Sequence, residues 1–160
     1  MKIPDLQEEL QQTKPFASKR EEAMLAVMKT ADIFRRRIGG VLEPYGITMQ
    51  QYNILRILRG AGPQGLPTLS IGQRLIEAAP GITRLLDRME SHDWVTRLRG
   101  KTDRRIVFAV ITQSGLEVLA AIDPHLAAFE AASLPLLSRE DLEKLVELLG
   151  KARAEHVPDR

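Results

Sequence analysis

The stretch RLRGKTDRRIVFAVI, at positions 97–111, holds the side chains whose chemistry is most informative in this sequence. Basic residues surround a glycine-containing turn, and a run of β-forming residues follows from Ile106 to Ile111. Cationic groups at the tip of a hairpin can bind a polyanion, and a narrow A·T-rich minor groove attracts inserted arginine. A merely solvated turn is the alternative interpretation. The basic residues are Arg97, Arg99, Lys101, Arg104 and Arg105.

Asp103 is the single acidic residue among these cations. A carboxylate makes a poor contact with phosphate, because both groups are anions. It can instead form a bidentate ion pair that holds a neighbouring guanidinium in one orientation before DNA arrives. We expect Arg105 to be that partner, with Arg104 as the alternative.

A two-faced helix is expected directly before the hairpin, over about residues 80–92. Ile82, Leu85, Leu86 and Met89 fall at i, i+3, i+4 and i+7, which predicts one buried stripe. The opposite face suits the major groove of DNA, where arginine donates two bonds to guanine and threonine bonds a base or touches a thymine methyl. That polar face carries Gly81, Thr83, Arg84 and Arg88.

A short helix, from about Thr68 to Ile76, is expected before this two-faced helix, with a turn at residues 77–79 between them. In a helix-turn-helix the second helix enters the major groove, and the first braces it against the DNA backbone. We therefore expect Thr68 and Ser70, at the start of the first helix, to contact phosphate.

Further helices are predicted on both sides of this unit. The predicted segments are residues 19–42, a helix capped by the Thr48–Gln51 capping box, residues 112–122 with an extension past Pro124 to Ala132, and a helix that starts near Ser138. The predicted fold is mainly α with a small β-hairpin wing: a winged helix-turn-helix with N- and C-terminal dimerisation helices. We expect residues 1–42 to form an N-terminal extension and dimerisation helix, residues 45–112 the DNA-binding domain, and residues 113–160 the C-terminal dimerisation helices.

The apolar stripe of the first long helix is wider than a small domain can cover alone. Its residues recur at three- and four-residue spacing: Met24, Val27, Met28, Ala31, Phe34, Ile38 and Val41. Dimerisation through the two ends of the chain would cover this stripe, so a homodimer is expected.

Composition excludes several classes of protein. The chain has 160 residues, a formal net charge of +2 and no cysteine, so disulfides, thiol sensors and Cys-ligated zinc are ruled out. The three histidines lack ligand spacing, and no nucleophile–base pair or phosphate loop appears. We expect no metal, no cofactor and no enzymatic activity. No apolar run nears the roughly 18 residues that span a bilayer, so a cytoplasmic protein with no membrane partner is expected.

Residues 82–115, ITRLLDRMESHDWVTRLRGKTDRRIVFAVITQSG, resemble the signature of the MarR family of bacterial transcriptional regulators. The matching parts are a TRLLDRLE-like segment, a W-V-x-R entry to the wing, D-x-R at its tip, and a hydrophobic strand before T-x-x-G. The pattern T-x-x-Q-Y-x-I-L at residues 48–55 agrees as well. His92-Asp93 departs from the Lys/Gly turn that is commoner in the family.

The resemblance implies a triangular homodimer that binds double-stranded DNA, with Gly81, Thr83, Arg84 and Arg88 facing the major groove and Asp103, Arg104 and Arg105 at the wing tip. A repressor of a pseudo-palindromic operator is the expected function. The family often binds small aromatic or amphipathic effectors, which makes Met28, Met49 and Tyr52 candidates for effector binding, although core packing is the favoured explanation for these residues. A winged-helix module that binds another protein, without ligand response, is the alternative.

Overall fold

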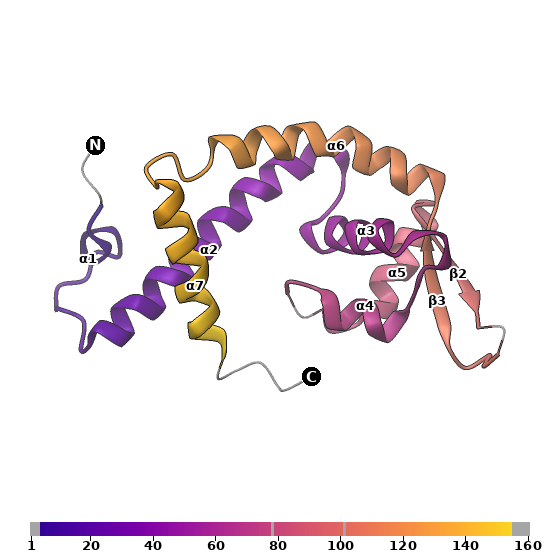
Figure 1. Cartoon of the computed structure of the whole chain (residues 1–160), viewed down its shortest axis with the longest axis horizontal. Coiled ribbons are helices and arrows are strands. Elements are labelled where there is room, and N and C mark those ends of the chain that lie inside the picture. Colours follow the sequence, from indigo (N-terminus) through magenta and orange to yellow (C-terminus); the bar gives the residue numbers. More distant parts are fainter. Residues whose placement is uncertain (1–3, 78, 101, 155–160) are drawn as a thin grey trace. The chain divides into compact units, whose positions relative to one another are not determined.

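The computed structural model describes residues 4–77, 79–100 and 102–154, and Lys101 therefore lies outside the described residues. The elements before the hairpin are α1 (Leu6–Glu9), α2 (Lys19–Leu42), the 3-10 turn Glu43–Tyr45, α3 (Met49–Ala61), the 3-10 turn Gly62–Gln64, β1 (Leu66–Pro67), α4 (Thr68–Arg74) and α5 (Ile82–Ser91). The hairpin is β2 (Val95–Arg99) and β3 (Val107–Ile111), followed by α6 (Gln113–Ala132) and α7 (Arg139–Ala154). Figure 1 shows α3, α4 and α5 gathered beside the hairpin. The winged helix-turn-helix expected from the sequence is confirmed.

The chain divides into two compact units, Met1–Leu126 and Ala127–Arg160. The first unit contains the core, to which α3, α4, α5, β2, β3 and α6 contribute. Its largest fully buried side chains include Ile54, Leu55, Leu58, Ile71, Leu86, Met89, Val95, Leu119 and Ile122. In the second unit the Ser138 hydroxyl accepts from the backbone N–H of Asp141, and the Asp141 carboxylate accepts from Ser138 in return. This reciprocal cap starts α7.

The capping box at the start of α3 is confirmed. The Thr48 hydroxyl accepts from the backbone N–H of Gln51 at 3.3 Å, and the Gln51 side chain accepts from the backbone N–H of Thr48 at 2.9 Å. Both bonds satisfy N–H groups that a helix start leaves free. The side of α3 that follows is buried through Tyr52, Leu55 and Leu58.

The sheet has one strand more than the sequence predicted. The strand order is β1-β3-β2, both pairings are antiparallel, and Leu66 lies opposite Ala109. A strand of two residues has no periodicity to detect, and Pro67 argues against one. Its effect is local but useful, because β1 leads directly into α4 and ties the helix-turn-helix to the hairpin.

The two-faced helix starts later than expected. The sequence predicted a start near Pro80, but α5 begins at Ile82 because Gly81 has a left-handed backbone, with φ of 85°. An L-residue with a side chain pays about 1–2 kcal/mol in that conformation, whereas glycine does not. Gly81 therefore directs the chain into α5. The preceding helix also ends earlier, at Arg74, because Leu75 is extended.

The apolar stripe of α2 is left largely uncovered. Leu42 is the single buried residue of this helix, while Met24 is 59% exposed and Met28 62% exposed. Exposed apolar side chains gathered on one helix are typical of an interaction surface. Within the described residues, no helix is long and apolar enough to cross a membrane.

Candidate nucleic-acid interface

The recognition helix, α5, separates its two faces as the sequence predicted. Leu85, Leu86 and Met89 are buried in the core, while Thr83, Arg84 and Arg88 are exposed. Among the described residues, neither guanidinium of Arg84 and Arg88 has an ion-pair partner. These side chains are therefore available to a ligand of opposite charge.

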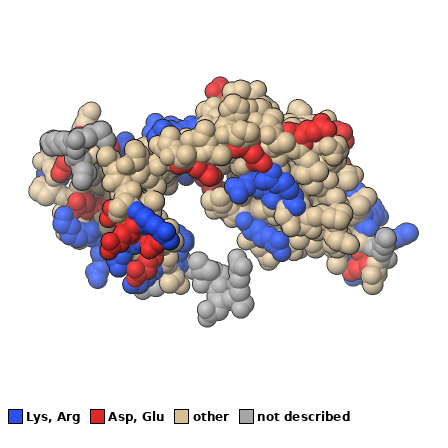
Figure 2. All heavy atoms as spheres, turned by 45° about the horizontal axis from the view of Figure 1, so that its top comes forward, with Lys and Arg blue, Asp and Glu red and all other residues tan. Residues whose placement is uncertain are grey.

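The wing consists of β2, β3 and the loop 100–106 between them. Its arms pair in register from Val95 opposite Ile111 to Arg99 opposite Val107. The loop is closed by a bond from the Gly100 N–H to the Ile106 carbonyl, 2.8 Å long, and by one from the Ile106 N–H to the Asp103 carbonyl, 3.2 Å long. Figure 2 shows basic side chains at this end of the molecule, beside a small acidic area.

Asp103 acts differently from the expectation. Its carboxylate accepts a hydrogen bond from the backbone N–H of Arg105, at 2.9 Å. Within the described part of the chain it forms no ion pair with the guanidinium of Arg104 or Arg105, so the bidentate pair predicted from the sequence is wrong. A carboxylate two residues before an N–H is placed to form a local turn, and this short-range bond forms instead. The guanidinium groups of Arg104 and Arg105 stay exposed.

A groove of about 370 Å³ lies between the starts of α4 and α5 and the wing. Its lining is mainly apolar, and it brings together four residues that the sequence singled out separately. These four are Thr68, Thr83, Arg97 and Arg105, and Leu69 and Ile106 line the same groove. The recognition helix and the wing therefore present one continuous surface.

Arg97 is not free to bind DNA in the way the sequence suggested. Its guanidinium contacts Glu90 Oε2 through Nη2 at 2.6 Å and Asp87 Oδ1 through Nη1 at 2.7 Å. A hydrogen bond from Arg97 is the main cause that lowers the pKa of the Glu90 carboxyl, and the same bond raises the pKa of Arg97. Asp87 and Glu90 were missed as site residues, because no short-range spacing rule links a helix carboxylate to a strand arginine.

Thr68 and Ser70 are both half-buried. The Thr68 hydroxyl donates to the backbone carbonyl of Val107, at 3.1 Å, and so joins the start of α4 to β3. This bond uses the hydroxyl proton that a phosphate contact would need. Of the other expected residues, Arg99 on β2 is exposed and Gly81 lies exposed at the start of α5.

The three effector candidates differ in exposure and do not line one cavity among the described residues. Met28 is exposed on α2, whereas Tyr52 is buried, with the Arg56 guanidinium 5.9 Å from its ring centre. Met49 borders a cavity of about 20 Å³, whose lining also includes Leu75 but neither Met28 nor Tyr52. That volume is close to the room one water needs, so it is too small for an aromatic effector.

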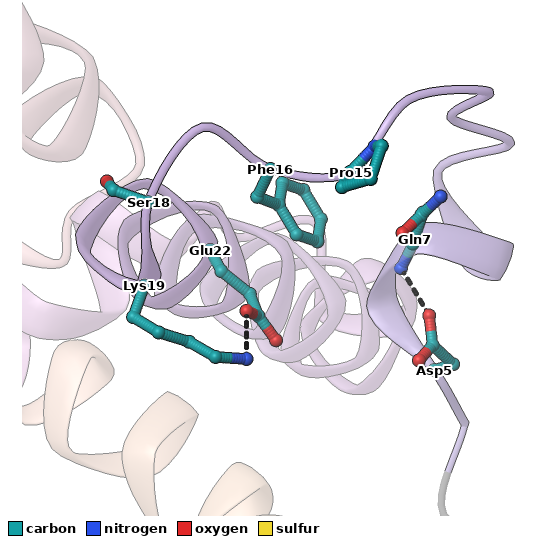
Figure 3. Close-up of a pocket in the computed structure, with 7 residues that line it drawn as sticks. All are labelled: Asp5, Gln7, Pro15, Phe16, Ser18, Lys19 and Glu22. Carbon is teal, nitrogen blue, oxygen red and sulfur yellow. Dashed lines mark hydrogen bonds and ion pairs between the residues drawn. The ribbon is translucent and has the colours of Figure 1, made fainter.

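A polar pocket of about 310 Å³ lies between α1 and the start of α2, and Figure 3 shows its lining. Lys19 and Glu22 form an ion pair of 2.6 Å beside it, and the Asp5 carboxylate accepts from the backbone N–H groups of Gln7 and Glu8. Its charged side chains thus already have partners on this chain. Nor do the described residues contain a group of three or more His, Cys, Asp or Glu that could hold a metal ion.

Comparison with known proteins points to one family. The model of the MarR family matches residues 47–107. The HTH-type transcriptional regulator MhqR of Bacillus subtilis (strain 168) is 32% identical over 110 residues, which cover 69% of this chain and 74% of MhqR. The uncharacterized HTH-type regulator YkoM of the same organism is 30% identical over 139 residues, covering 82% of this chain and 89% of YkoM.

Solved structures agree in fold. AbsC, a MarR family transcriptional regulator from Streptomyces coelicolor, superposes with a TM-score of 0.77 at 28% identity, over 89% of this chain and 97% of AbsC. A mutant MarR from E. coli, complexed with operator DNA, has a TM-score of 0.71 at 23% identity, over 93% of this chain and 99% of its own. The S. aureus MepR–DNA complex has a TM-score of 0.72 at 22% identity, over 81% of this chain and 94% of MepR.

Proposed function

Because the chain belongs to the MarR family of DNA-binding transcriptional regulators, which are not enzymes, we propose that it acts as a homodimeric repressor. The homodimer binds a pseudo-palindromic operator whose half-sites lie about one helical turn apart. In each half-site, α5 enters the major groove and the wing reaches the adjacent minor groove. A small-molecule effector releases the protein from DNA.

One observation supports this placement above the others. Thr83 of α5 and Arg105 of the wing line the same groove, and Arg84 and Arg88 are exposed on α5 without ion-pair partners among the described residues. A helix with free arginines can read guanine edges, and an adjacent basic wing can contact the minor groove. In two of the solved structures of similar fold, the protein is bound to DNA.

The proposed homodimer rests on α2. Its exposed Met24, Val27 and Met28 form an apolar surface within one stretch of the helix. A second copy of the chain would cover this surface symmetrically, since a two-fold interface uses the same patch on both subunits. We assign residues 1–42 and 113–160 to dimerisation and residues 45–112 to DNA binding.

The proposed effector is a small aromatic or amphipathic molecule. NadR, which superposes with a TM-score of 0.69 at 25% identity, has been solved in complex with 4-hydroxyphenylacetate. A ligand that prefers a dimer with wrongly spaced recognition helices would weaken DNA binding by its differential affinity for that state.

Fluorescence anisotropy tests the central proposal. The full chain is titrated against the DNA upstream of its own gene and against a random duplex of equal length, from about 50 to 200 mM salt. We expect a preference of about a thousandfold or more for the upstream DNA, with a steep salt slope. No binding to either duplex at low salt would contradict the proposal and favour a basic wing that binds an acidic protein.

A further inference from the structure

Arg97, on β2 of the wing, contacts α5 through its backbone N–H and through all three nitrogens of its guanidinium. The backbone N–H of Arg97 donates to Glu90 Oε1 at 3.1 Å, and its Nε donates to Glu90 Oε2 at 2.9 Å. Nη2 also donates to Glu90 Oε2, at 2.6 Å, and Nη1 pairs with Asp87 Oδ1 at 2.7 Å. The guanidinium is thus shared between two carboxylates on one helix.

The sequence positions explain this geometry. Asp87 and Glu90 are three residues apart on α5, so their side chains are neighbours on the helix surface. Arg97 follows Val95 by two residues on β2 and therefore points to the same side of the strand, where Val95 is buried. Residues 92–94 connect the two elements, and the bonds from Arg97 close this corner.

We propose that Arg97 is a positioning residue that sets the orientation of the wing relative to the recognition helix, and not a DNA contact. This inference rests on the proposed function, in which α5 and the wing enter neighbouring grooves. Simultaneous entry requires one fixed angle between them, and bonds between two rigid elements supply it. Glu90 binds the guanidinium of Arg97 through Oε2 and the backbone N–H of Arg97 through Oε1. Charge-assisted hydrogen bonds are directional as well as attractive, so this set restricts angles that apolar packing would tolerate.

The fold does not depend on these bonds. The side chains of Arg97, Asp87 and Glu90 are 28%, 51% and 36% exposed, whereas the packing between α5 and β2 uses the buried Leu86, Met89 and Val95. Partly exposed ion pairs add little to global stability. Variants at Arg97 are therefore expected to fold, which leaves DNA binding as the property that changes.

The test compares Arg97→Ala with Arg99→Ala. Arg99 lies two residues further along β2 and carries the same charge, but it is exposed and has no ion-pair partner among the described residues. The duplex is one that the wild-type protein selects from a random pool, and thermal melts confirm that both variants fold. If Arg97 is a positioning residue, Arg97→Ala binds the selected duplex about tenfold more weakly, equivalent to about 1.4 kcal/mol, with an unchanged salt slope. Arg99→Ala lowers that slope by about 0.9, the value for one phosphate contact.

Glu90→Gln should change DNA affinity in opposite directions, depending on whether Arg97 positions the wing or contacts DNA. It keeps the shape of the side chain and removes a negative charge near DNA. As a positioning partner, the neutral amide would bind Arg97 less well than the carboxylate does, so the variant should lose affinity for the selected duplex. If Arg97 were a DNA contact restrained by Glu90, the freed arginine would strengthen binding to every duplex.

The outcomes separate the two proposals. A wild-type protein that selects no duplex contradicts the proposed function itself. A selective wild type together with a flattened salt slope for Arg97→Ala, or tighter binding for Glu90→Gln, overturns the positioning role alone. Selective wild-type binding, about tenfold weaker binding by Arg97→Ala at an unchanged slope, and weaker binding by Glu90→Gln support both. Wild-type affinity for Arg97→Ala overturns the positioning role.

Discussion

At the tip of the wing, the Asp103 carboxylate accepts a hydrogen bond of 2.9 Å from the backbone N–H of Arg105. Together with the bonds between Gly100, Asp103 and Ile106, it fixes the backbone that carries Arg104 and Arg105. An acid among basic residues thus contributes to the shape of the tip, although its charge opposes the approach of DNA.

Replacement of Asp103 by alanine tests which effect is larger. Loss of one hydrogen bond of about 1 kcal/mol should loosen the tip and weaken DNA binding about fivefold, even though an anion is removed. Asp103→Asn is the matched control, because its side-chain oxygen can still accept from Arg105. Anisotropy at one salt concentration distinguishes them, and tighter binding by the alanine variant would show that charge outweighs shape.

Arg84 and Arg105 should differ in what they recognise. On the proposed placement, Arg84→Ala costs about 1–3 kcal/mol on the cognate duplex and much less on a random one. Arg105→Ala should weaken both and reduce the salt slope by about 1, as expected for a phosphate or minor-groove contact. Salt-dependent titrations of each variant on the two duplexes measure these effects. An equal loss for Arg84→Ala on both would make Arg84 a phosphate contact.

Gly100→Ala should disturb the wing without unfolding the domain. A Cβ at this position would lie 2.5 Å from the backbone carbonyl oxygen of Asp103, closer than packed atoms allow, so the loop must shift. We expect weaker DNA binding with little change in melting temperature. Gly60→Ala is the control, because nothing lies within 4 Å of its added Cβ and alanine favours a helix by up to about 1 kcal/mol. Equal binding by both variants would argue against a shaped tip.

Met28→Lys should weaken the homodimer. Met28 is 62% exposed on α2, and a lysine there would place a charge within the proposed apolar interface. Size-exclusion chromatography with light scattering at several concentrations should show more monomer. Gly40→Lys adds the same charge to α2 about 160° around the helix from Met24, and nothing lies within 4 Å of an added Cβ there, so it should leave the dimer intact. A dimer that survives Met28→Lys would place the interface elsewhere.

The Glu90–Arg97 pair predicts a pH dependence of stability. The pKa of Glu90 is lowered in the folded protein, so its contribution is present above the ordinary pKa of glutamate and is lost as pH falls through the lowered value. The urea midpoint of the wild type should therefore exceed that of Glu90→Gln at neutral pH, and the gap should narrow below about pH 4. A gap that stays constant with pH would exclude ionisation of Glu90 as its source.

The parts predicted correctly from the sequence depend on local order. The helix stripe of α5 and the capping box of Thr48 involve residues at most seven positions apart, where periodicity and capping rules apply. β1 was not predicted, because Leu66 and Pro67 form a strand only through their pairing with β3. Its existence depends on a partner more than forty residues away.

The sequence predicted which residues of the site are exposed, but not which residues pair with one another. Thr83, Arg84, Arg88 and Arg105 are exposed as expected, whereas Arg97 pairs with the helix before it. A sequence shows that an arginine is charged, but its partner is determined by the strand direction and by which carboxylates the neighbouring helix presents. Arg97, which the sequence suggested as a DNA contact, instead binds two carboxylates of the neighbouring helix.

The wing has two parts: a base, in which β3 is paired on both sides, and the loop 100–106 at its end. β3 pairs with β1 on one side and with β2 on the other. The loop 100–106, which precedes β3, is closed by hydrogen bonds between its own residues Gly100, Asp103 and Ile106. No fully buried side chain lies within that loop among its described residues. Related regulators could therefore diversify the sequence of this short loop, and with it their preference among minor grooves, while the folding of the domain stays the same.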